Sequence, residues 1–169
     1  SDQIDITAKT NLQLSVNPNA DLAADSNWTA INSGSVSHGA YGKDGSNGLR
    51  LVTSTSQTNE GVKTDNFALT GGRRYRYKIT IKAQATVVDA FTFKFIAGNG
   101  TSTITTESHI LKTDWVTYEG EIIPPANGIA GRVELYVEGS TGSSNGVNID
   151  IDSWYLYGPA QTSEFEVNK

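Results

Sequence analysis

The segment Gly131-Arg-Val-Glu-Leu-Tyr-Val-Glu-Gly139 alternates between apolar and polar side chains along its length. Successive side chains of a β-strand point to opposite faces, so the pattern predicts a strand with one apolar and one polar face. The apolar row is Val133, Leu135 and Val137, and the polar row is Arg132, Glu134, Tyr136 and Glu138. We expect the apolar row to face a core. The polar row offers a ring that can stack on sugar C–H groups and charged groups that can hydrogen-bond hydroxyls, which favours a binding role.

The rest of the chain has the same β character. Segments rich in Val, Ile, Thr, Tyr and Phe recur at short spacing, and four Asn-Gly pairs mark tight turns between them. Strands are expected near residues 11–16, 28–38, 48–54, 62–70, 73–84, 90–97, 102–111, 114–123, 131–138 and 147–157. Only residues 20–25 could form a helical turn. This pattern predicts an all-β fold, a β-sandwich jelly roll of two antiparallel sheets.

The segment 73–83 predicts which residues build the core. Its inward row is Tyr75, Tyr77, Ile79, Ile81 and Ala83, and its outward row is Arg74, Arg76, Lys78, Thr80 and Lys82. Further core positions are expected at Leu49, Leu51, Phe67, Leu69, Phe91, Phe93, Phe95, Trp154 and Leu156. The basic outward row could face an anionic ligand. We favour a solvated surface, because lysine on exposed strands guards against sheet aggregation.

Composition narrows the class of protein. The 169 residues correspond to one domain, expected over residues 11–160, with a polar linker remnant at 1–10 and a polar tail at 161–169. The chain has no apolar run of membrane-spanning length. It begins without Met, so we expect it to be a processed piece of a longer protein. The absence of cysteine excludes disulfides. A net charge of −5 argues against nucleic acid as a partner and suits a neutral ligand.

Four blocks then suggest a family. They are residues 17–29 (Asn-Pro-Asn-Ala-Asp, then Asn-Trp-Thr), Leu69-Thr-Gly-Gly-Arg-Arg-Tyr75, Thr113-Asp-Trp-Val-Thr-Tyr118 and Asn148-Ile-Asp-Ile-Asp-Ser-Trp-Tyr-Leu156. In this order the chain resembles carbohydrate-binding modules of the family 4, 9 and 22 type, found beside polysaccharide-degrading enzymes. The resemblance implies a galactose-binding-like β-jelly roll. It also implies a non-catalytic module that binds a polysaccharide or glycan and tethers a larger secreted or surface protein to it.

The resemblance carries site residues with it. In such modules a late polar strand supplies an Arg and, four residues on, a ring to a concave groove, and Arg132 and Tyr136 match those positions. The strand before the second block adds Glu60 and Lys63, Glu134 lies between the matched pair, and Tyr41 is a candidate platform at a loop tip. Large aromatic platforms are missing from the neighbouring strands. The set therefore suits a short, charged or highly hydroxylated glycan.

The same modules commonly hold a structural calcium ion. The resemblance implies that the calcium ligands here are Asp21, Asp152 and the loop 42–48, which contains Asp44. Calcium takes six to eight oxygen ligands in flexible geometry, and this loop is rich in oxygen. The alternative is that Asp21 and Asp152 only cap loops.

The sequence also offers two alternatives to a binding module. Glu119 and Glu121 lie two apart on one strand, near the carboxylate spacing of inverting glycosidases. No third polar group nearby in sequence would tune them, and His38 and His109 lack metal-ligand spacing, so we expect no catalysis. The main rival is a structural or adhesive jelly-roll domain of a phage fibre, surface protein or multidomain enzyme without a sugar site. Either function predicts an extracellular or cell-surface location, in a bacterium or phage.

Overall fold

The computed structural model describes residues 28–32, 34–54, 60–68, 70–84, 90–97, 102–109, 112–126, 130–138 and 148–157. These ranges form two antiparallel sheets. The first, called the β10 sheet, has the order β1-β4-β10-β7-β8, and β5 also pairs with β10. Its strands are β1 (Trp28–Ile31), β4 (Glu60–Thr64), β5 (Phe67–Ala68), β7 (Ala90–Ala97), β8 (Ser102–His109) and β10 (Ala130–Glu138).

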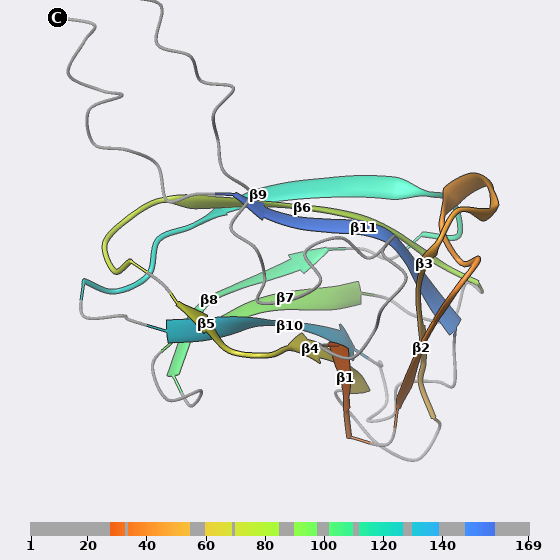
Figure 1. Ribbon diagram of the computed structural model, residues 1–169, viewed down its shortest axis with the longest axis horizontal. Coiled ribbons are helices and arrows are strands. Elements are labelled where there is room, and N and C mark those ends of the chain that lie inside the picture. The colour runs from red at the N-terminus through yellow and green to blue at the C-terminus, as the bar shows by residue number, and fades with distance from the viewer. Residues whose placement is uncertain are drawn as a thin grey trace, which may run out of the picture.

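The second sheet, called the β11 sheet, has the order β2-β3-β11-β6-β9. Its strands are β2 (Ser35–Gly39), β3 (Gly48–Val52), β6 (Tyr75–Ala83), β9 (Val116–Ile122) and β11 (Asn148–Tyr157). In Figure 1 strands β9, β6 and β11 form one layer above β8, β7 and β10. The expected β-sandwich of two antiparallel sheets is confirmed. The one helix in the described ranges is the 3-10 turn Lys43–Gly45, so no helix there is long and apolar enough to cross a membrane.

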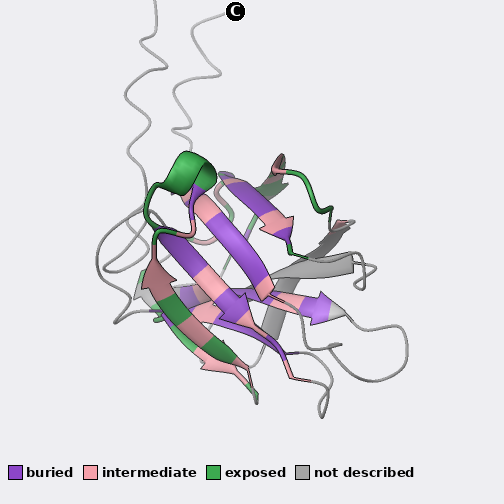
Figure 2. Cartoon of the chain, turned by 90° about the vertical axis from the view of Figure 1, so that its right-hand side faces the viewer, coloured by how far each residue is buried: buried purple, intermediate pink, exposed green. Residues whose placement is uncertain are grey.

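The core fills the space between the sheets. Buried apolar residues come from both layers: Trp28, Leu49, Leu51, Val62, Tyr75, Tyr77, Ile79, Ile81, Ala83, Leu135, Val137, Ile149, Ile151, Trp154 and Leu156. Figure 2 shows the result as buried and less buried bands alternating along the strands, with the 3-10 turn exposed. Trp28 and Trp154 bring their ring centroids within 5.0 Å of each other. The predicted inward rows are therefore confirmed wherever the structure describes those side chains; Phe67, Leu69, Phe91, Phe93 and Phe95 lie outside that description.

One residue of the outward row is not exposed. Thr80 is 9% accessible, and its hydroxyl lies 2.8 Å from that of Thr117 on β9. It sits where β11 has a bulge, between Ile151 and Ser153. Cross-strand threonine pairs satisfy each other's hydroxyls on a sheet face. The alternation predicted the face of Thr80 correctly, and only its exposure was wrong.

Two predicted strands are each divided in the structure. The segment 28–38 becomes β1 and β2, which belong to different sheets, and Asn32 between them has a left-handed φ of 60°. Asparagine tolerates this conformation better than most residues. The segment 62–70 becomes β4, which begins at Glu60, and the short β5. The expected strand 11–16 and the expected linker and tail at 1–10 and 161–169 lie outside the described residues.

Candidate functional site

Strand β10 carries its polar row on the face that points away from the core. Leu135 and Val137 are fully buried in the core cluster. Because side chains alternate along a strand, Arg132, Glu134 and Tyr136 lie on the opposite, outer face of the β10 sheet. The strand is central in its sheet, between β4 and β7, so both neighbours add residues to this face. The predicted polar face of segment 131–139 thus exists.

The three polar side chains hydrogen-bond to one another. Arg132 Nε and Nη2 lie 2.8 and 2.7 Å from Glu134 Oε1, and Tyr136 Oη donates to Glu134 Oε2 at 2.8 Å. The Glu134 side chain is only 5% exposed, whereas that of Arg132 is 19% exposed and Tyr136 is half-buried. Residues i and i+2 share a strand face, so their spacing in the sequence produces these contacts. We call this group the Arg132–Glu134–Tyr136 trio.

The surroundings of Tyr136 shift its protonation. Burial, followed by the hydrogen bond to Glu134, raises the pKa of Tyr136 to about 12. The ordinary value is about 10. Because the folded value is the higher one, the hydroxyl stays protonated at neutral and mildly alkaline pH. Tyr136 therefore keeps donating its hydroxyl proton to Glu134.

Strand β4 adds the fourth predicted residue. Lys63 lies directly opposite Glu134 in the antiparallel register, and Gly61 lies opposite Tyr136. Directly opposed residues share a face, so Lys63 is on the outer face with the trio. The structure therefore brings Lys63, Arg132, Glu134 and Tyr136 together.

Glu60 is not part of this face, which corrects the sequence-based prediction. It is paired with the buried Val137 and is 0% exposed. Its Oε2 accepts a hydrogen bond from the backbone N–H of Ser54 at 2.8 Å. Glu60 and Lys63 are three residues apart on one strand, so alternation places them on opposite faces. Glu60 ties the start of β4 to the chain just after β3 and does not line the candidate site.

Tyr41 is also separated from the trio. It precedes the 3-10 turn that joins β2 to β3, on the β11 sheet. The Arg50 guanidinium carbon lies 4.1 Å from the centroid of its ring, a cation–π contact. One face of the ring is thus already covered. The structure does not support Tyr41 as a platform in the same site as Tyr136.

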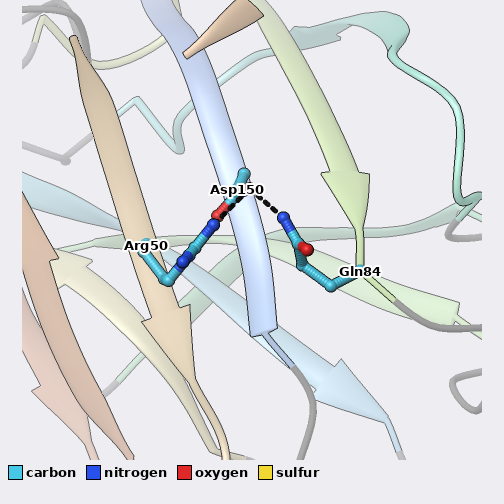
Figure 3. A network of polar contacts seen from close by, with 3 residues as sticks. All are labelled: Arg50, Gln84 and Asp150. Carbon is cyan, nitrogen blue, oxygen red and sulfur yellow. Dashed lines mark hydrogen bonds and ion pairs between the residues drawn. The ribbon is translucent and has the colours of Figure 1, made fainter. Parts of the chain in front are cut away.

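The outer face of the β11 sheet holds a polar network that the sequence did not reveal (Figure 3). Arg50 of β3 binds both carboxylate oxygens of Asp150 at 2.7 and 3.0 Å, and Gln84, just after β6, donates to Asp150 Oδ2 at 2.5 Å. The hydrogen bond to Asp150 raises the pKa of Arg50. The Asp150 side chain is 3% exposed and that of Arg50 is 26% exposed. The network joins three adjacent strands across a sheet face.

The three calcium candidates meet different outcomes. Asp21 lies outside the described residues. Asp152 Oδ1 accepts hydrogen bonds from Lys43 N at 2.7 Å and Ser46 Oγ at 3.1 Å, so it ties the loop to β11. Asp44 is exposed at the loop tip, with a left-handed φ of 57°. The described residues contain no cluster of three His, Cys, Asp or Glu side chains able to hold a metal.

The loop nevertheless gathers oxygen atoms around Gly42. A β-carbon added there would touch Ser46 Oγ and lie 2.6 Å from Asn47 O and 2.8 Å from Asp152 Oδ1. Only glycine leaves space for three oxygens to converge in this way. An all-oxygen donor set is the kind that calcium prefers.

The basic row of β6 is a solvated surface. Arg74 and Arg76 lie 3.5 and 3.9 Å from Glu121, and Lys78 lies 3.9 Å from Glu119. All five side chains are between 44% and 57% exposed, so these pairs are screened by water. Glu119 and Glu121 are therefore partners of surface cations. They lack the burial that is typical of a catalytic acid.

His109 likewise has a packing role. Its Nε2 lies 2.9 Å from Tyr77 Oη, and its ring centroid is 4.6 Å from that of Tyr118. The histidine at the end of β8 therefore contacts β6 and β9 of the other sheet. It joins the two layers of the sandwich.

Comparisons with known proteins agree with this architecture. No protein-family model matches the chain, and no curated protein matches it. Among solved structures, the N-terminal CBM22-1–GH10 modules of Clostridium thermocellum endo-1,4-beta-D-xylanase 10B, complexed with xylohexaose, match with a TM-score of 0.63 and 16% identity. The match covers 85% of this chain and 27% of that one.

Two isolated modules match over nearly their whole length. The C-terminal family 22 carbohydrate-binding module of the same Clostridium thermocellum enzyme has a TM-score of 0.61 and 17% identity, over 84% of this chain and 91% of that one. The CBM22-2 xylan-binding domain of Paenibacillus barcinonensis Xyn10C has a TM-score of 0.60 and 17% identity, over 83% and 97%. The expected resemblance in fold to carbohydrate-binding modules is thus confirmed.

Proposed function

We propose that this domain is a non-catalytic carbohydrate-binding module whose ligand lies on the outer face of the β10 sheet. The observation that carries the proposal is the Arg132–Glu134–Tyr136 trio, a partly accessible ring held beside a guanidinium by a buried carboxylate. Support also comes from the fold, which the chain shares with modules solved as xylan binders. A parent protein outside the cell, held near a polysaccharide, is part of the same proposal.

The physical argument rests on preorganisation. The trio's hydrogen bonds fix the side chains before a ligand arrives, which lowers the entropy lost on binding. One stacked ring and two or three hydrogen bonds to charged groups give modest affinity, on the order of 10 μM to 1 mM. Such values suit a module that gains its effect by being attached to a larger protein.

A glycan screen by affinity electrophoresis tests the proposal. We expect the wild-type domain to be retarded by one class of polysaccharide, and Tyr136→Ala to weaken that binding by about tenfold because the stacking ring is lost. Tyr136→Phe keeps the ring but loses the hydrogen bond to Glu134, and should bind with intermediate strength. Tyr155→Ala removes a tyrosine from the other sheet and should bind normally.

Two other results would contradict the proposed site or the proposed function. Normal binding by Tyr136→Ala with loss in Tyr155→Ala would move the site to the β11 sheet. A folded protein that binds no glycan would favour a structural or adhesive domain.

We also infer that the loop 42–48 holds a calcium ion. Asp152 and oxygens from Ser46 and Asn47 would hold it, and Asp44 would add charge at the loop tip. The oxygens around Gly42 support this inference. The ion would stiffen the loop and has no part in chemistry.

Thermal unfolding in calcium and in a chelator tests the calcium inference. Calcium at a hundredfold excess over its dissociation constant would add about 2.7 kcal/mol, which is several degrees in Tm for a domain of this size. Asp44→Asn should reduce the calcium-dependent shift while leaving Tm in the chelator near the wild-type value, because Asp44 is exposed. Equal Tm values with and without calcium would contradict the inference.

A further inference from the structure

The buried carboxylate of the candidate site already accepts hydrogen bonds from its own neighbours. Glu134 Oε1 accepts from Arg132, Glu134 Oε2 accepts from Tyr136, and the side chain is 5% exposed. Sugar hydroxyls need acceptors as well as donors, and Glu134 is too enclosed to act as an acceptor for them. What the centre of this face offers a ligand is therefore a ring, a tyrosine oxygen and positive charge.

A cation lies beside Glu134. In the register of the β10 sheet, Lys63 of β4 is directly opposite Glu134. Lys63 is half-buried and forms no ion pair with another residue of the described part of the chain. Since the charge of Glu134 is balanced by Arg132, Lys63 is left as excess positive charge at the centre of the face.

No described acid on this side of the sheet forms an ion pair with Lys63. Glu138 ends β10, four residues from Glu134, which is about 13 Å along a strand. Asp65 follows β4, is exposed, and pairs with no cation among the residues that the structure describes. The whole chain carries a net charge of −5, so a lysine without an ion pair on the face of the ring opposes the overall trend.

We infer that the outer face of the β10 sheet binds an acidic glycan, a chain that carries uronic acid residues, with Lys63 paired to the uronate carboxylate. The inference rests on the proposed function and names its ligand class. The Tyr136 ring would stack on a sugar of the chain while the ammonium of Lys63 pairs with the carboxylate of a neighbouring unit. Charge complementarity, more than contact area, would then set the preference for acidic over neutral glycans.

A glucuronoxylan and the same polymer after reduction of its carboxyl groups form a matched pair of probes, because backbone and length are identical. We expect the wild-type domain to bind the acidic polymer about fivefold more tightly, as one partly exposed ion pair allows, and to lose that preference in high salt. Lys63→Met should bind both polymers equally, and Lys63→Arg should restore the preference. Lys78→Met removes a lysine from the other sheet and should behave as wild type.

Each outcome separates the two proposals. Equal binding of both polymers by the wild type overturns the acidic-glycan inference and leaves the carbohydrate-binding function standing. A preference that survives Lys63→Met but disappears in Lys78→Met moves the cation to the other sheet and also overturns it. Binding to neither polymer, with none to any glycan in the wider screen, overturns the carbohydrate-binding function itself.

Discussion

Asp150→Ala is expected to lower the free energy of unfolding by about 2–3 kcal/mol. The substitution removes the carboxylate that receives two hydrogen bonds from Arg50 and one from Gln84. Losing one partner of a buried ion pair costs about 3–5 kcal/mol, since the remaining charge is left without compensation. Arg50 is 26% exposed and can turn partly to water, which reduces the cost.

Urea unfolding measures this effect, with Glu119→Ala as the matched control. Glu119 pairs with Lys78 on the same sheet face, but both side chains are exposed and 3.9 Å apart, so we expect a loss under about 0.5 kcal/mol. The double variant Arg50→Met/Asp150→Ala should recover part of the stability, because the stranded charge is gone. A loss from Asp150→Ala as small as that from Glu119→Ala would show that the network is not stabilising.

The periodicity of the sequence was sufficient to predict most of the described strands and their core faces, but it did not show where 28–38 and 62–70 divide. The alternation in segment 131–139 placed Arg132, Glu134 and Tyr136 on one face, and their i, i+2 spacing made the contacts of the trio a local property. The same parity rule shows that Glu60 and Lys63 must be on opposite faces. The error over Glu60 therefore came from grouping residues by segment, and a strict application of alternation would have avoided it.

The Asp150 network could not be predicted in the same way. Asp150 lies 100 residues from Arg50 and 66 from Gln84, and they meet only because β3, β11 and β6 are neighbours in one sheet. Strand order and register depend on the packing of the whole domain, and no local pattern encodes them.

Fold and site are coupled most directly where β4 meets β10. The site needs Lys63 opposite Glu134, and that register requires the two backbones to approach closely at Gly61. A β-carbon built at Gly61 would collide with the carbonyl oxygen of Leu135 and lie 3.1 Å from the Cα of Tyr136. Glycine is therefore required here by the close approach of two strands.

Gly61→Ala is accordingly expected to cost about 3 kcal/mol of stability and to weaken glycan binding together with it. A collision with backbone cannot be relieved by rotating a side chain, so β4 must move away from β10, which is the severe end of overpacking. That movement also displaces Lys63 from its place beside the trio. Urea unfolding and affinity electrophoresis of the folded protein measure the two effects.

Gly34→Ala is the matched control, because its added β-carbon would meet only a tight 3.2 Å contact with the oxygen of Val52. We expect it to cost under about 1 kcal/mol and to bind normally. If Gly61→Ala were instead as stable as Gly34→Ala and bound glycan normally, β4 would not pack against β10 as closely as the register requires. The position of Lys63 beside Glu134, and with it the acidic-glycan inference, would then lose its structural basis.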